Sequence, residues 1–123
     1  MRLAVVGSRN FTDYETAKVI LDELQKDIGF DRIVSGGANG ADSLAEKYAW
    51  ANDIDIAIFV PDWSIGKQAG FIRNVEIWDN ADYGVAFWDG KSKGTAHSFK
   101  LAKKQKKRLF VFDALRNDFY EAN

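Results

Sequence analysis

Residues 32–49 read RIVSGGANGADSLAEKYA, and this stretch decides the fold. It begins as a short apolar run, breaks at a glycine-rich loop, and continues with apolar residues at helical spacing. The same order of apolar run, polar break and helical segment occurs four times along the chain, which then reaches a fifth apolar run. Short β-rich runs of this kind are typical of a parallel sheet that is buried on both faces.

The pattern predicts five strands, at Leu3–Val6, Arg32–Ser35, Ile54–Val60, Tyr83–Trp88 and Arg108–Phe112. Helices are expected at about residues 12–28, 41–49, 67–80 and 95–106. Thr12 and Glu15 have the spacing of a capping box for the first helix. Ile72, Val75 and Trp78 are expected on one side of the third.

Alternating strands and helices imply right-handed crossovers and layers of helices on both faces of the sheet. The prediction is therefore an α/β protein, a Rossmann-like three-layer sandwich with a parallel sheet of about five strands. Residues 1–112 form a single domain in this interpretation. Residues 113–123 form a short polar C-terminal tail, which we expect to be a short docked helix.

Composition narrows the functional classes. The chain has 123 residues, of which 46% are hydrophobic, and the seventeen Lys and Arg against eighteen Asp and Glu give a net charge of −1. That balance argues against a dedicated DNA-coating protein, and a nucleic-acid partner is judged unlikely. Without cysteine and with one histidine, no thiolate or His-rich metal site is expected. No apolar run reaches the ~18–20 residues of a membrane span, so we expect a cytoplasmic protein.

In an open parallel sheet, ligands bind outside the carboxyl ends of the strands. Four glycine-bearing loops follow the first four predicted strands, and each leads into a helix. They are residues 7–10, 36–42, 61–66 and 89–95. Two common phosphate motifs are absent: the second loop reads G-G-x-x-G rather than G-x-G-x-x-G, and a P-loop ending at Gly90-Lys91-Ser92 would need glycine where Val85 stands.

The second loop gives the sharpest candidate. Gly36 and Gly37 let the backbone approach a ligand closely, and Gly40 opens a helix whose free N–H groups favour phosphate. A tight turn that needs glycine only for its geometry is the alternative. Asp42 is interpreted as a helix cap or loop brace in preference to a catalytic acid.

Other candidates surround the same edge. Gly94 and Thr95 would hold a second phosphate or a ribose oxygen, with Thr95 as a plain helix cap as the alternative. Arg9 and Arg73 would contact phosphate through both arms of the guanidinium, unless each forms a surface ion pair. Trp63 could stack on a base. The Trp88 ring could stack on a base or could equally pack in the core. The basic run 100–108 is either a solvated helix end or a nucleic-acid contact.

Several motifs together resemble the small YspA-like SLOG proteins, of the superfamily that joins the DNA-processing protein DprA and the Lonely Guy enzymes. They are Gly7-Ser8-Arg9, residues 35–42, Asp62-Trp63, residues 69–74, and residues 86–90 with Gly94-Thr95. The resemblance covers residues 1 to about 112 in order. It implies a Rossmann-like fold with a site for a nucleotide-derived ligand, and a homo-oligomer, because related folds often pair through helices.

Lonely Guy enzymes cleave the N-glycosidic bond of a nucleoside monophosphate, with the signature P-G-G-x-G-T-x-x-E and an arginine on the preceding helix. Gly94-Thr95 match its G-T, and Arg73 occupies the arginine's place. Ser98 stands at the position of the catalytic glutamate. Serine cannot replace a carboxylate in that chemistry, so this resemblance favours binding over cleavage.

The main functional hypothesis is therefore a sensor, carrier or sequestering module that binds a nucleotide-derived small molecule. A hydrolase of N-glycosidic or phosphoribosyl bonds is the first alternative, and a DprA-like nucleic-acid binder is the second. No catalytic residue, metal or certain cofactor is assigned. The predicted ligand-binding residues are Gly7, Ser8, Arg9, Gly36, Gly37, Gly40, Asp42, Asp62, Trp63, Arg73, Asn74, Asp89, Gly94 and Thr95.

Overall fold

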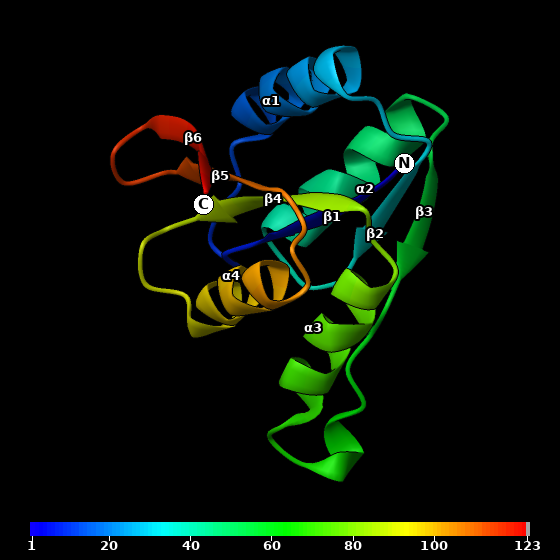
Figure 1. Ribbon diagram of the computed structural model, residues 1–123, viewed down its shortest axis with the longest axis vertical. Helices are drawn as coiled ribbons and strands as arrows, with labels where there is room; N and C mark the ends of the chain where they lie inside the picture. The colour runs from blue at the N-terminus through cyan, green and yellow to red at the C-terminus, as the bar shows by residue number, and fades with distance from the viewer. Residues whose placement is uncertain (123) are drawn as a thin grey trace.

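A computed structural model describes residues 1–122 and shows a six-stranded sheet with helices on both faces (Figure 1). The strand order is β3-β2-β1-β4-β5-β6, and only β6 runs antiparallel to its neighbour. The strands are β1 (Arg2–Gly7), β2 (Arg32–Ser35), β3 (Asp55–Ile58), β4 (Tyr83–Trp88), β5 (Leu109–Asp113) and β6 (Asp118–Ala122). The predicted Rossmann-like α/β fold is confirmed.

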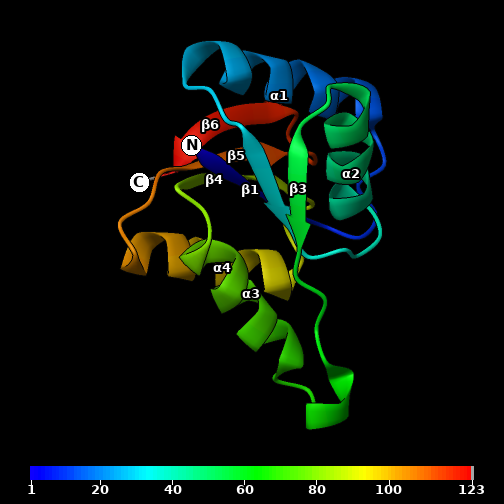
Figure 2. The same ribbon diagram turned by 90° about the vertical axis from the view of Figure 1, so that its right-hand side faces the viewer.

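The helices form two layers around the sheet (Figure 2). They are α1 (Tyr14–Asp27), α2 (Ala41–Ala51), α3 (Ala69–Asp79) and α4 (Lys93–Lys104), with a short 3-10 helix η1 (Trp63–Ile65) before α3. One core cluster joins α1 and α2 to the sheet through side chains such as Leu21 and Tyr48. The second joins α3 and α4 to the other face through Ile77, Trp78 and Ala102.

The C-terminal tail differs from the prediction. Residues 118–122 form strand β6 rather than a helix, and the sheet therefore has six strands. Phe119 stacks on Phe110 of β5 with ring centroids 6.0 Å apart, and Arg108 forms a 2.8 Å ion pair with Glu121. A polar five-residue strand at a sheet edge carries too weak an alternation to be distinguished from a tail by sequence.

The helix caps also differ from the prediction. Asp13, not Thr12, caps α1, because its carboxylate accepts a hydrogen bond from the Thr16 backbone N–H. Ser92 caps α4 by accepting a hydrogen bond from the Thr95 backbone N–H. Thr95 is therefore not the cap, and its hydroxyl donates a 3.0 Å hydrogen bond to the Ser92 hydroxyl.

Helix α3 buries a different face from the predicted one. Asn74, Ile77 and Trp78 are buried, whereas Ile72 and Val75 are exposed. The apolar spacing of Ile72, Val75 and Trp78 was therefore misleading, because α3 crosses toward α4 and turns the first two outward. None of the helices within residues 1–122 is long and apolar enough to cross a bilayer.

Candidate functional site

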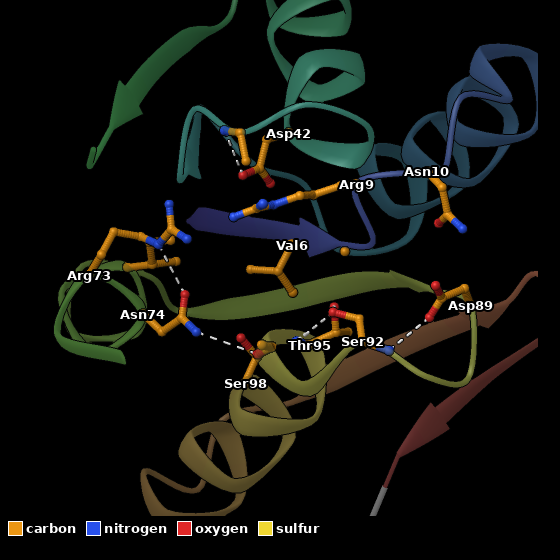
Figure 3. Close-up of a pocket in the computed structure, with 14 residues that line it drawn as sticks. Val6, Arg9, Asn10, Asp42, Arg73, Asn74, Asp89, Ser92, Thr95 and Ser98 are labelled. Carbon is orange, nitrogen blue, oxygen red and sulfur yellow. Dashed lines mark hydrogen bonds between the residues drawn. The ribbon is translucent and has the colours of Figure 1, made fainter. Parts of the chain in front are cut away.

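Two adjoining pockets lie at the carboxyl edge of the parallel strands. Their volumes are about 370 Å³ and 270 Å³, and both are lined by Arg9, Ala38 and Arg73. We call the two pockets together the rim groove. Its larger end is closed by α4 and the loop after β4 (Figure 3), and its smaller end by the loop after β2 and the segment that leads into η1.

Arg73 stands at the junction of the two pockets. Its guanidinium donates a 2.8 Å hydrogen bond to the carbonyl oxygen of Gly36 and a 3.1 Å bond to the side-chain oxygen of Asn74 (Figure 3). The side chain is about half buried, and burial lowers the pKa of the guanidinium. Arg73 is therefore held in place by the loop after β2 and needs no ion pair to fix it.

Arg9 reaches the same junction from the loop after β1. It is exposed, and within residues 1–122 its side chain makes no hydrogen bond or ion pair. Its charge is close enough to Arg73 to lower the pKa of that guanidinium, and Figure 3 shows both side chains directed into the groove. Two guanidinium groups brought together in this way favour an anion between them, since each prefers a bidentate oxyanion partner.

Asp42 lies under this pair and braces the loop after β2. Its carboxylate accepts a 3.1 Å hydrogen bond from the Ala38 backbone N–H, which is the loop-brace role predicted from sequence. Burial raises the pKa of Asp42 to about 6, against the opposing effects of the Ala38 hydrogen bond and the positive charge of Arg73. A weakly acidic carboxyl near Arg73 makes the local charge depend on pH near neutrality.

The loop after β4 is fixed by Asp89. Its carboxylate accepts hydrogen bonds from the backbone N–H groups of Lys91 and Ser92, at 2.8 and 2.9 Å. The Ser8 hydroxyl in turn accepts a 2.9 Å bond from the Asp89 N–H, so Ser8 connects the loops after β1 and β4. The start of α4 is thereby held against the groove, where the side chains of Thr95 and Ser98 line its wall.

The glycines of the groove have different roles. Gly37 has a φ of +70°, and a Cβ there would lie 2.8 Å from the Ile58 Cγ2 atom. A Cβ at Gly36 would overlap the Arg73 guanidinium. At Gly94 an added Cβ would meet nothing within 4 Å. The backbone at position 94 would therefore accept a larger residue, and the glycine leaves open space at the start of α4.

Trp63 lies at the outer end of the smaller pocket. It is 54% exposed and its ring lies over Gly70, whose missing side chain makes room for it. Asp62 caps η1 by accepting a hydrogen bond from the Ser64 N–H, and so positions Trp63 without reaching the groove. Trp88, by contrast, packs edge-on against Phe99 with centroids 5.0 Å apart, and it is a packing residue.

Most of the predicted site residues do line the rim groove. Ser8, Gly40 and Asp62 do not line it. Gly40 lies so close to the carbonyl oxygens of Ser8 and Arg9 that no Cβ would fit, and Asp62 is exposed at the start of η1. Sequence reasoning missed Val6, Asn10, Ala38, Asn39, Val60, Pro61, Ile77, Ser92 and Ser98 as lining residues. Asn10 and Ser92 lie in the first and fourth glycine-bearing loops. Their polar side chains near Arg9 and Gly94 could have marked them as lining residues.

The fold is that of a Rossmann-like α/β protein, and the rim groove lies at the carboxyl edge of its sheet. The sequence matches the YspA, cpYpsA-related SLOG family (YAcAr) over residues 1–66, and the chain belongs to that family. It is 35% identical to the Gene 61 protein of Mycobacterium phage D29 over 111 residues, which are 84% of this chain and 89% of the phage protein.

The fold is similar to that of DNA processing protein A from Helicobacter pylori, whose solved structure concerns its single-stranded DNA binding mode. The TM-score is 0.72 with 24% sequence identity, and the match covers 90% of this chain. It covers 64% of the Helicobacter protein, so this chain spans less than two thirds of that protein's length.

These comparisons overturn the hypothesis of a small-molecule nucleotide module without a nucleic-acid partner, because DNA processing protein A, which has a similar fold, binds single-stranded DNA. The error lay in averaging the charge over the chain. Eight of the seventeen Lys and Arg residues fall between positions 91 and 108, where none of the eighteen Asp and Glu residues lies. A net charge of −1 therefore coexists with a strongly basic α4 region.

Proposed function

We propose that the protein binds single-stranded DNA along the rim groove. The observation that carries this proposal is the pair Arg9 and Arg73 at the junction of two pockets, with no carboxylate paired to either within residues 1–122. A groove with a pocket on each side of a charged junction suits a strand that lies across both pockets, with a phosphate between the two guanidinium groups.

The two ends of the groove differ in a way that suits a strand of nucleotides. Trp63 offers a half-exposed ring at the smaller end, and every base can stack on such a surface whatever its sequence. At the larger end the side chains of Asn10, Asn74 and Thr95 give the wall a polar surface, which suits a base edge or a sugar. A positively charged path with an aromatic platform is the usual design for sequence-tolerant binding of single strands.

The lining of the rim groove favours an unpaired strand over a duplex. The rim groove is a crevice between loops that brings Arg9 and Arg73 together, and a double helix reaches proteins through its grooves and outer phosphates. An unpaired strand can turn its bases into the pockets. We therefore expect single-stranded DNA to bind more tightly than the same sequence in duplex form.

Fluorescence anisotropy with a labelled oligothymidylate of about 16 nucleotides tests the proposal. Binding should weaken steeply with salt, since each neutralised phosphate contributes a slope of about −0.7 for a single strand. Arg9→Ala should weaken binding. Arg32→Ala is the matched control, because Arg32 lies at the opposite, amino end of β2 and pairs there with Asp55.

Two results would overturn the proposal. One is the absence of binding at low salt. The other is displacement of the oligonucleotide by a mononucleotide at an equal concentration of nucleotide units, because a strand that spans both pockets gains from its connectivity and a single nucleotide does not.

A further inference from the structure

A second basic surface adjoins the rim groove on the outer side of α3 and α4. Phe71, Lys93, Ala96, His97 and Lys100 line a shallow pocket of about 450 Å³ there, and we call this surface the α4 platform. Figures 1 and 2 both show α3 and α4 side by side at this point. The site described above uses none of these five residues.

The α4 platform and the rim groove share a wall. The Asn74 side chain lines the groove and lies within hydrogen-bonding distance of the His97 Nδ1 atom, at 3.3 Å. Its amide also donates to the Gly94 carbonyl oxygen, at 3.4 Å. Asn74 therefore lies between the larger pocket and His97 of the α4 platform.

The platform combines charge with an aromatic surface. Lys93 and Lys100 are exposed and are separated by seven residues of helix, about 10 Å along one face. Within residues 1–122 neither lysine forms an ion pair. Phe71 is 50% exposed and forms a T-shaped pair with the His97 ring, with centroids 4.7 Å apart, so the Phe71 ring is held in place by His97.

We propose that a single strand of DNA leaves the rim groove over Asn74 and His97 and continues along the α4 platform. Its phosphates contact Lys93 and Lys100, and a base stacks on Phe71. This inference rests on the proposed function, and it gives the binding site its direction and its length. Unpaired cations spaced along one helix face beside an exposed ring match the alternation of phosphates and bases in a single strand.

The test compares the affinity for a short oligothymidylate of about 4 nucleotides with that for one of about 16, which span the usual site sizes of single-strand-binding domains. The variant is Lys93→Ala with Lys100→Ala. The matched control is Lys18→Ala with Lys26→Ala, which removes the same charge from α1 on the opposite face of the sheet. Both oligonucleotides are titrated by anisotropy at several salt concentrations.

The platform variant should lose about 10-fold in affinity for the long oligonucleotide at 0.1 M salt, and its salt slope should fall by about 1.4. Its affinity for the short oligonucleotide should match that of the control variant. Phe71→Ala should likewise weaken binding of the long oligonucleotide and leave binding of the short one unchanged. Its salt slope should not change, because the substitution removes a stacking surface and no charge.

The outcomes separate the two proposals. If the unmodified protein binds neither oligonucleotide, the proposed function is wrong and the platform with it. If the protein binds both oligonucleotides and the platform variant keeps the same ratio of long to short affinity as the control, only the platform is wrong. If the control variant loses as much affinity for the long oligonucleotide as the platform variant does, the platform is also wrong.

Discussion

Arg73 on α3 donates a 2.8 Å hydrogen bond from its Nη1 atom to the carbonyl oxygen of Gly36, thirty-seven positions away. The bond ties α3 to the loop after β2. It also explains why position 36 is glycine, because a Cβ there would overlap the guanidinium. Arg73 thus belongs to the scaffold of the rim groove as well as to its surface, whereas the Arg9 side chain makes no such contact.

This difference predicts distinct behaviour for the two arginines. Arg9→Ala should reduce the affinity for oligothymidylate roughly 10- to 100-fold, because a charge-assisted hydrogen bond is worth about 1.5–3 kcal/mol. Its melting temperature should not change. Arg73→Ala should lower both affinity and melting temperature, since the Gly36 carbonyl loses its partner. Anisotropy titrations and thermal melts followed by circular dichroism measure the two effects.

Arg73→Lys provides the control for charge. It keeps the positive charge but loses the bidentate geometry, so it should recover only part of the affinity. If Arg9→Ala bound DNA as tightly as the unmodified protein, the phosphate would not lie between the two guanidinium groups.

The fold was predictable because its signals are local and repeated. Four apolar runs that are each followed by a glycine-bearing loop and a helix leave few alternatives to a parallel α/β sandwich. Strand β6 was not predictable, since its pairing depends on contacts such as Phe119 with Phe110 that appear only when β5 is in place.

The candidate site was predictable to the level of loops. Carboxyl ends of parallel strands gather at one edge, so Arg9, Gly37 and Thr95 were expected together before any coordinates. Composition was a poor guide to the partner class, because net charge contains no information on where lysines lie. The run from Lys91 to Arg108 shows a local basic region, yet a basic helix end is also common in proteins that bind no nucleic acid.

The two glycines Gly37 and Gly94 should respond oppositely to substitution. Gly37→Ala should destabilise the protein by about 1–2 kcal/mol, because φ is +70° and the new Cβ would meet Ile58. Gly94→Ala should raise the melting temperature, since alanine is favoured over glycine in a helix by up to about 1 kcal/mol and open space receives the methyl group. Thermal melts of both variants test this.

A larger side chain at position 94 tests the groove itself. Gly94→Leu should leave the melting temperature at or above that of the unmodified protein and should weaken DNA binding, because the side chain enters the larger pocket. Unchanged affinity in a folded Gly94→Leu variant would place the strand elsewhere.

Trp63 should act as a stacking platform. Trp63→Ala should weaken oligonucleotide binding by about 1–3 kcal/mol, the usual value for one stacked base, and Trp63→Phe should retain most of the affinity. Trp50→Phe is the control, since Trp50 lies at the end of α2 and is 72% exposed. Binding should quench tryptophan emission in the protein and in Trp50→Phe, and a quench of equal size in Trp63→Phe would contradict the assignment.

Asp42 should make both stability and DNA binding depend on pH. Its pKa is raised by burial from 3.8 to about 6, so the folded state holds the proton more tightly than the unfolded state. The stabilisation is complete below about pH 4 and is lost as the pH rises through about 6; the shift corresponds to about 3 kcal/mol. Urea denaturation of the protein and of Asp42→Asn should therefore show the unmodified protein losing stability relative to the variant between about pH 4 and pH 6.

The same carboxyl should also affect DNA binding. Above about pH 6 the ionised Asp42 carboxylate opposes a phosphate beside Arg73, so the affinity for oligothymidylate should increase as the pH falls through about 6. In Asp42→Asn that increase should disappear and the affinity at neutral pH should be higher. An equal pH dependence in the two proteins would show that another group controls it.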